Sequence, residues 1–529
     1  MNNKYNYLFF RIAILVLILA GFCFTTVYAE AGSMASSGAS STTTTQKRIQ
    51  GPTGVSLPPR STTSARVRTP SPIKTAAKTP VAVSNLRTPT KAGEPRPVSA
   101  PPVVSPSETL PSYVPDIKSN QNNKKLSKNL NGYYFYIAAP WDASEDVNIN
   151  KEAIEAFKKE YNCRVIFLNL SKDTIYNMLL KSSVTGVSYF DAILTDASNI
   201  LVNFEPLGLL EEFNKYMTQE ELNNIPKSYK NFLSKEDKLY GIPAYAPDFS
   251  GLWINNNLLK KYNINNPVNS FNSNKWTWEA FNSFVNECYG SKTPNSDNTD
   301  LYGITTSSEI YLPILEANGG SLYRWTGNKF ISGAGSKSSV NGLTLAKNLF
   351  NTGYISLEYE KRFYKEEAAI LAGEISMYPD IKKHLTSSEF TFLAYPMNKE
   401  TNTHISTANY ANCASIVKTS KYPAHTAELL KIIYGGDNFN KRIDNYIKDN
   451  KLTNQISTMY KKMLENFTID YSRTFDTSLN LNKTIMSLLK NGTFSKVSAE
   501  SSLVPVIEKL IKQKSKDVDL SEVQNQIKW

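Results

Sequence analysis

The pattern of apolar and polar positions changes sharply near residue 131 of this chain. The run YYFYIAAPWD (133–142) is continuously apolar and ends in Pro, Trp and Asp, which predicts a buried parallel strand. Helix and strand patterns then alternate, in the order NKEAIEAFKKEYN (helix), RVIFLNL (strand), TIYNMLL (helix) and YFDAILTDAS (strand). This alternation predicts an α/β body over 131–529, with helices on both faces of a parallel sheet.

Further helices are expected in the second half of the body. TWEAFNSFVNECY opens with Thr277 as a predicted N-cap, and NGTFSKVSAESSLVPVIEKLIKQ predicts a loop followed by a terminal amphipathic helix.

Three carboxylates stand out in this pattern. Ligands of open α/β sheets meet the carboxyl ends of the strands, where Asp142 and Asp196 are expected. Turn and helix-cap chemistry, which Asp also favours, is the alternative explanation of each position and needs no ligand. Asp248 lies in APDFSGLWIN, which predicts a buried strand, and a carboxylate there is costly unless it is paired. A structural role, capping a turn after Pro247, is one explanation of this residue.

The net charge of +12 lies entirely in residues 1–130, with 16 Lys and Arg against 4 Asp and Glu. The body is therefore neutral and has no basic stripe to follow phosphates, which argues against a nucleic-acid partner.

The first 31 residues have the order of a secretory signal peptide. Lys4 and Arg11 precede IAILVLILAGFCF, and small residues follow, with cleavage expected after Ala29 or Ala31. An uncleaved membrane anchor is the alternative, because the longer run IAILVLILAGFCFTTVYA, of eighteen residues, is just long enough to span a bilayer. Cys23 is preceded by Phe22 where a lipidation signal needs a small residue, so lipidation is not expected.

Residues 32–130 contain 14 prolines and one aromatic residue, Tyr113, which predicts a disordered spacer. Its basic charge suits adhesion to an anionic cell wall or membrane surface, but a solvated linker explains the charge as well.

Enzymatic and metal chemistry find little support in the residue types. His384, His404 and His425 show no metal-ligand or triad spacing, and no zinc-binding cysteine pattern occurs. We expect no catalysis, no cofactor and no metal, with Cys163, Cys288 and Cys413 as buried apolar residues. Paired carboxylates for glycoside hydrolysis, from Asp142, Asp248 and Glu309, are the remaining enzymatic alternative.

Several segments together resemble one family. LYGIPAYAPDFSGLWINNNLLKKYNI, WTWEAFNSFV, LEANGGSLY, GLTLAKNLF, EEAAILAGEISMYPDI and ANCASIVKTSKYPAHTAELLKII are similar, in order and spacing, to extracellular solute-binding proteins of sugar ABC importers, the maltose-binding type. The resemblance spans the whole body. It implies two discontinuous α/β lobes, about 131–244 with 388–436 and about 245–387 with 437–529, joined by a hinge and closing on a ligand between them.

The resemblance implies a sugar or oligosaccharide ligand, ABC permease subunits as partners, and a location outside the cell or on its surface. It also implies ligand contacts, carried over onto these positions: Asp248, Asp142, Trp141, Asp196, Ser198, Asn199, Glu309, Tyr311, Tyr378, Asp380, Tyr471 and Phe475. The family's aromatic residue beside Asp196 is missing here, and Ile381 lies nearest its stacking tryptophan, so Tyr378 is expected to supply that ring. A surface-tethered scaffold or sensor that keeps the fold without transport is the alternative function.

Overall fold

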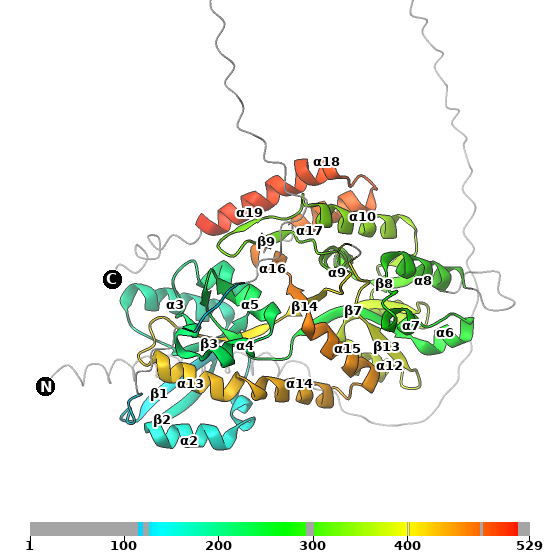
Figure 1. Ribbon diagram of the computed structural model, residues 1–529. Coiled ribbons are helices and arrows are strands. Elements are labelled where there is room, and N and C mark those ends of the chain that lie inside the picture. The colour runs from blue at the N-terminus through cyan, green and yellow to red at the C-terminus, as the bar shows by residue number, and fades with distance from the viewer. Residues whose placement is uncertain are drawn as a thin grey trace, which may run out of the picture. The chain divides into compact units, whose positions relative to one another are not determined.

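The first of two principal sheets has the strand order β2-β1-β3-β15-β6. The computed structural model describes residues 115–119, 126–291, 301–398, 400, 402–476 and 480–516. β1 pairs in parallel with β2 and β3, and β15 pairs antiparallel with β3 and β6. The strands are β1 (Tyr133–Ala139), β2 (Cys163–Asn169), β3 (Ala192–Asp196), β6 (Ile242–Pro243) and β15 (Asn412–Ile416). All three predicted strands are present, with the two predicted helices between them (Figure 1).

The second sheet has seven strands, ordered β11-β8-β12-β7-β14-β16, with β13 also paired to β7. β7 runs antiparallel to β12, β13 and β14, whereas β8 is parallel to β12 and β14 is parallel to β16. The strands are β7 (Asp248–Asn255), β8 (Ile304–Thr306), β11 (Ile355–Ser356), β12 (Ile370–Glu374), β13 (Phe390–Leu393), β14 (Ser406–Tyr410) and β16 (Phe467–Ile469). The carboxyl ends of β8, β12, β14 and β16 therefore meet at one edge, beside the amino end of β7.

Helices and two short hairpins surround the sheets. Thr277 accepts a hydrogen bond from the Ala280 N–H, which confirms the predicted N-cap. The α-helices are α2 (Lys151–Tyr161), α3 (Lys172–Thr185), α4 (Gln219–Asn223), α5 (Lys227–Leu233), α6 (Asn256–Tyr262), α7 (Val268–Asn272), α8 (Trp278–Gly290), α9 (Tyr311–Ala317), α10 (Lys337–Asn351), α11 (Glu360–Tyr364), α12 (Tyr378–His384), α13 (Pro423–Tyr434), α14 (Asp437–Asp449), α15 (Asn454–Glu465), α16 (Ser472–Phe475), α17 (Asn480–Lys490), α18 (Lys496–Ser498) and α19 (Val504–Lys516). Shorter turns of helix are η1 (Ser144–Asn148), η2 (Ile200–Phe204), η3 (Phe213–Tyr216), η4 (Ser308–Ile310), η5 (Ile375–Met377) and η6 (Ala499–Leu503), and the hairpins are β4 (Ser234–Lys235) with β5 (Lys238–Leu239) and β9 (Tyr323–Trp325) with β10 (Phe330–Ser332).

The chain crosses between the two sheets several times. It leaves the first sheet after β6, returns at β15, and reaches the second sheet again at β16. The predicted return at residue 388 is wrong, because β13 and β14 pair with β7 in the second sheet. Both strands are apolar enough to be buried in either sheet, and only the pairing with β7 decides their place. The other lobe boundaries stay predictions.

A buried polar network joins the crossing segments to the first sheet. Asp146 accepts hydrogen bonds from the hydroxyls of Tyr245 and Tyr434, and its other oxygen pairs with Arg442 Nη1 at 2.9 Å. The guanidinium of Arg442 lies 5.0 and 4.7 Å from the centroids of the two tyrosine rings. Because Tyr245 lies between β6 and β7 and Arg442 lies on α14, this network fixes two crossing segments against η1.

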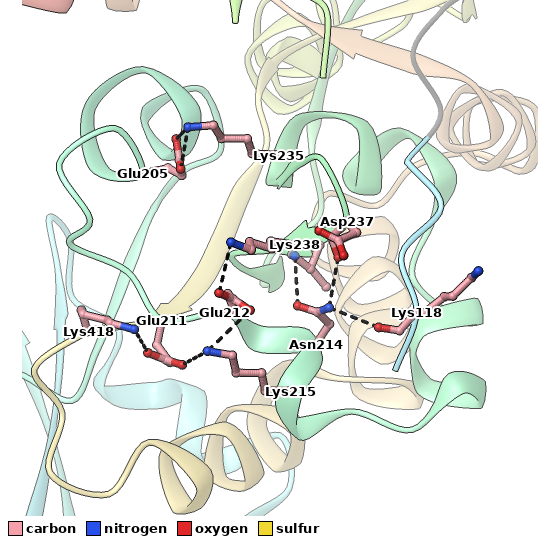
Figure 2. Close-up of polar contacts among 11 residues, drawn as sticks. Lys118, Glu205, Glu211, Glu212, Asn214, Lys215, Lys235, Asp237, Lys238 and Lys418 are labelled. Carbon is pink, nitrogen blue, oxygen red and sulfur yellow. Dashed lines mark hydrogen bonds and ion pairs between the residues drawn. The ribbon is translucent and has the colours of Figure 1, made fainter. Parts of the chain in front are cut away.

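The end of the predicted spacer belongs to the folded body. Ile117 and Leu130 are buried, at 6% and 4% exposure. Asn214 Nδ2 donates to the main-chain oxygens of Lys118, at 3.2 Å, and Asp237, at 3.1 Å (Figure 2). The predicted spacer limit at residue 130 is therefore too late, because the two apolar side chains bury enough surface to order 115–119 and 126–130. Residues 1–114, with the predicted signal peptide or anchor, lie outside the described residues.

Within the described ranges, no helix has both the length and the apolar composition needed to cross a bilayer. Cys163, Cys288 and Cys413 are buried with free thiols, as predicted.

Candidate functional site

A polar cavity opens at the edge of the second sheet where β8, β12, β14 and β16 end. Its volume is ≈ 540 Å³, including the open mouth. It is lined by Ser250, Thr306, Ser307, Glu309, Ile310, Leu312, Pro313, Tyr359, Ala372, Gly373, Glu374, Tyr395, Thr407, Asn409, Asp470 and Arg473. The topology of the sheet thus brings together residues that are more than 200 positions apart.

Glu374, the last residue of β12, lies on one wall of the cavity. Its carboxylate accepts hydrogen bonds from Tyr359 Oη at 2.7 Å and from Asn409 Nδ2 at 3.0 Å. Asn409 in turn accepts from Ser250 Oγ at 3.1 Å. These donors are neutral, so they orient the Glu374 carboxylate without cancelling its charge.

Arg473 faces this wall from α16. Its Nη2 lies 3.4 Å from Glu309 Oε2, and its Nη1 donates to Tyr410 Oη at 3.2 Å. Tyr410 is 49% exposed, and the Arg473 guanidinium lies 5.8 Å from the centroid of its ring. The part of the ring that Arg473 does not cover is open to solvent next to the cavity.

Asp470 lines the cavity, and its carboxyl interacts with that of Glu316, which lies behind it. Glu316 is buried and its Oε2 has no hydrogen-bond partner among the described residues. Burial raises the pKa of both carboxyls, and the negative charge of Asp470 adds to the rise at Glu316. Both groups are therefore harder to ionise than a carboxyl in water.

Asp248 begins β7 next to this cavity. Its two oxygens accept hydrogen bonds from Ser376, one from the N–H at 3.1 Å and one from the hydroxyl at 2.8 Å. Burial raises the pKa of Asp248 to about 6 against the opposing effect of these hydrogen bonds, and the Glu374 charge adds to the rise. Asp248 thus caps the η5 turn, 128 positions further along the chain, whereas the predicted alternative was a cap of the turn directly after Pro247; its ligand contact stays a prediction. The same carboxylate stands one strand away from Glu374.

Comparison with known proteins now defines the family. The chain matches the bacterial extracellular solute-binding protein family over residues 152–448, more than half of its length. It belongs to that family. No curated protein sequence matches the chain.

Solved structures share the fold of this solute-binding protein. A cyclo/maltodextrin-binding protein complexed with maltotetraose has a TM-score of 0.55 at 14% identity, over 71% of this chain and 96% of that one. A cyclic α-maltosyl-1,6-maltose binding protein from Arthrobacter globiformis has 0.54 at 13% identity, over 72% and 100%. An extracellular solute-binding protein from Staphylococcus aureus in complex with maltose has 0.50 at 13% identity, over 76% and 98%. The predicted two-lobed α/β fold and the predicted family are confirmed, and the family places the protein outside the cytoplasm.

The predicted site residues of the first lobe lie at the strand ends, as expected. Asp142 is exposed and accepts from the Ser144 N–H at 2.9 Å, so it caps a turn. Asp196 accepts from the N–H groups of Ser198 and Ala411, at 2.9 and 3.2 Å. Asp196 thereby ties the end of β3 to the crossing between β14 and β15.

The other three predicted residues of the first lobe are half-buried or buried and hydrogen-bonded. Trp141 Nε1 donates to the hydroxyl of Tyr245 at 3.2 Å. Ser198 Oγ lies 2.8 Å from Thr474 Oγ1 on α16, a direct contact between the chain segments of the two sheets. Asn199 accepts from Asn203 Nδ2 at 2.7 Å. Their ligand contact stays a prediction.

Most of the predicted aromatic contacts are packed inside the second lobe. Tyr378 stacks on Trp253 with centroids 5.4 Å apart, and Phe475 stacks on Tyr323 at 4.4 Å. Four rings are between 2% and 8% exposed: Tyr311, Tyr378, Tyr471 and Phe475. Asp380 is exposed on α12. Of the predicted set, Glu309 alone lines the cavity.

Sequence reasoning missed the other polar residues of the cavity. Glu374 stands inside the quoted segment EEAAILAGEISMYPDI, where an acidic residue ending an apolar strand could have identified it. Asn409 and Tyr410 end β14 in the same manner, whereas Asp470 and Arg473 follow a strand of only three residues. No pattern in the sequence marks so short a strand.

The rest of the described chain holds another cavity and three histidines, but neither feature brings the predicted site residues together. A larger cavity, ≈ 1040 Å³, is lined by parts of α4, β6, α13 and α14 and contains none of the predicted site residues. The three histidines bond separate main-chain oxygens, of Asp380, Tyr395 and Ser127. No cluster of three or more metal-ligating side chains occurs among the residues that the structure describes.

Proposed function

We propose that the protein captures a sugar or oligosaccharide between its lobes and delivers it to the permease of an ABC importer. The observation that carries this proposal is the cavity at the four strand ends, which Glu374, Asn409 and Arg473 line, and where Arg473 bonds the exposed Tyr410 next to it. Sugars carry hydroxyls around the rim of a ring with an apolar face. Planar carboxylates, an amide and an exposed aromatic ring therefore match both parts of such a ligand.

Membership of the solute-binding family supports the same function. The three similar structures are named for, or bound to, maltose or maltodextrin-type glucans. Closure of the lobes would bring the strand ends of the first lobe, with Asp142 and Asp196, toward the cavity. Ligand then favours the closed state by the contacts that only this state provides.

A scaffold or sensor without transport is the second candidate, and one observation favours it. The carboxylates near the cavity already accept hydrogen bonds from their own neighbours: Glu374 from Tyr359 and Asn409, and Asp248 from Ser376. A protein that keeps this fold and whose own residues already supply the hydrogen bonds of these carboxylates needs no ligand to supply them.

The deciding experiment is thermal unfolding of the full-length protein with maltose, maltotetraose and a panel of monosaccharides. Peptides, polyamines and divalent metals serve as controls. A ligand at 100 times its dissociation constant stabilises the protein by about 2.7 kcal/mol. We expect a rise in the melting temperature with sugars only, which Glu374→Gln abolishes. Glu389→Gln, at an exposed surface ion pair with Lys260, is the matched control and should keep the rise. A flat response to all classes would favour the scaffold.

Retention at the cell surface is part of this proposal. The basic residues of 32–130 would bind anionic wall polymer or lipid headgroups, and an uncleaved anchor would serve the same purpose. Equal binding of wall material by the full-length protein and by a variant lacking 32–110 would refute adhesion by this segment.

A further inference from the structure

The charges that line the cavity do not balance. Three carboxylates, Glu309, Glu374 and Asp470, face it, and Arg473 is the only basic side chain among its described lining residues. The Arg473 guanidinium is already engaged by Glu309 and by the Tyr410 hydroxyl. The cavity therefore carries excess negative charge.

The surroundings add to this excess. Asp248 and Glu374 receive hydrogen bonds from neutral donors, and no described Lys or Arg forms an ion pair with either. Behind Asp470 stands the buried Glu316, whose Oε2 has no hydrogen-bond partner among the described residues; burial raises the pKa of this carboxyl well above its usual range and so favours its neutral form, which adds no charge. Burial raises the pKa of Asp248, Asp470 and Glu316, and in each case a neighbouring carboxylate adds to the rise.

An unpaired hydroxyl also marks the cavity as a place for a ligand. Thr407 lines it, is 2% exposed, and its Oγ1 has no hydrogen-bond partner among the residues that the structure describes. The hydroxyl is close enough to Glu316 to lower the pKa of that carboxyl, but the two groups do not meet hydrogen-bond geometry. A buried polar group without a partner costs free energy that a ligand atom can recover.

We propose that the ligand is a sugar bearing a protonated amine, an amino sugar, held by Glu374 and Asp470 with its ring against Tyr410. This inference rests on the proposed function, since it names the class of sugar that the same cavity takes. An ammonium group donates three hydrogen bonds and supplies the positive charge that the cavity lacks, whereas a neutral sugar leaves the excess in place. A sugar acid adds a further negative charge and should be rejected.

The test compares sugars that differ at one substituent. The full-length protein is titrated calorimetrically at pH 7 with glucosamine, galactosamine, mannosamine and the β-1,4-linked glucosamine disaccharide. Each is compared with its N-acetyl and hydroxyl counterparts, and glucuronic acid is added. We expect at least one amine to bind ten-fold or more tightly than both counterparts, with no binding of glucuronic acid. The preference should shrink as salt is raised, because it is electrostatic.

Two variants locate the preference. Glu374→Gln keeps the shape of the side chain and should reduce the ten-fold preference to near unity, whereas Glu389→Gln should leave it unchanged. If Glu374→Gln does not fold, Glu309→Gln removes a charge from the opposite wall and should weaken amine binding in the same direction. If the folded variant still binds the amine ten-fold more tightly than its counterparts, this cavity is not the site that recognises the amine.

The remaining outcomes separate this inference from the proposed function. Equal or tighter binding of neutral sugars, maltose and maltotetraose included, refutes the amine preference and leaves sugar capture standing. Binding of a polyamine such as spermidine without any sugar refutes both. A failure of every sugar to bind refutes sugar capture itself, and the inference falls with it.

Discussion

The protonation of Asp248 gives a quantitative prediction for stability. Burial raises the pKa of this carboxyl from 3.8 to about 6. Each pKa unit corresponds to about 1.4 kcal/mol, so the shift corresponds to about 3 kcal/mol of unfolding free energy at most. Solvent that still reaches the half-buried side chain screens the charge and reduces this value. Because the pKa is raised in the folded state, the stabilising contribution is complete below about pH 4 and is lost as pH rises through 6.

Asp248→Asn removes the ionisation but keeps an oxygen that can accept from the Ser376 N–H. Between pH 4 and pH 7.5 the wild type should therefore lose up to about 3 kcal/mol relative to the variant. The assay is urea unfolding of both proteins at several pH values. The difference in unfolding free energy between the two proteins is taken at each pH, so that the titration of all other groups cancels. Ser376→Ala removes a donor to the charged form and should enlarge this loss. A difference that is independent of pH would refute the reasoning.

Three further outcomes follow from the contacts described above. Asp146→Asn leaves the buried Arg442 guanidinium without its counter-ion, so urea unfolding should show a loss of about 3–5 kcal/mol, and a loss below 1 kcal/mol would contradict the network. Burial raises the pKa of Glu211, but the lysines that bond it lower it overall, so its stabilising effect is present above about pH 4.5 and lost at lower pH (Figure 2). Glu211→Gln should therefore reduce the denaturation midpoint at pH 7 and leave it unchanged near pH 2, and an equal loss at both would refute this. Ile117→Ala should cost about 2–5 kcal/mol if 115–119 is part of the body, whereas no change in urea unfolding would show it is dispensable.

The local arrangement of the chain could be read from its sequence. Continuous apolar runs ending in polar residues located β1, β3 and β7, and helical spacing located α2 and α8 with its Thr277 cap. Asp142 and Asp196 were placed correctly at strand ends, because the end of a strand is marked by a local change from apolar to polar residues. The family was recognisable for the same reason, from the order of many such segments.

The sequence by itself therefore determined the elements, the α/β class and the family of this protein. Only the tertiary structure decided which side chains share a cavity, because Glu374, Asn409 and Arg473 meet through strand pairings that no local pattern encodes. It also decided which aromatic rings are free: Tyr378 is buried against Trp253, while Tyr410 stays open. Burial of a ring depends on what packs against it from elsewhere in the chain, and that partner is fixed by the fold rather than by neighbouring residues.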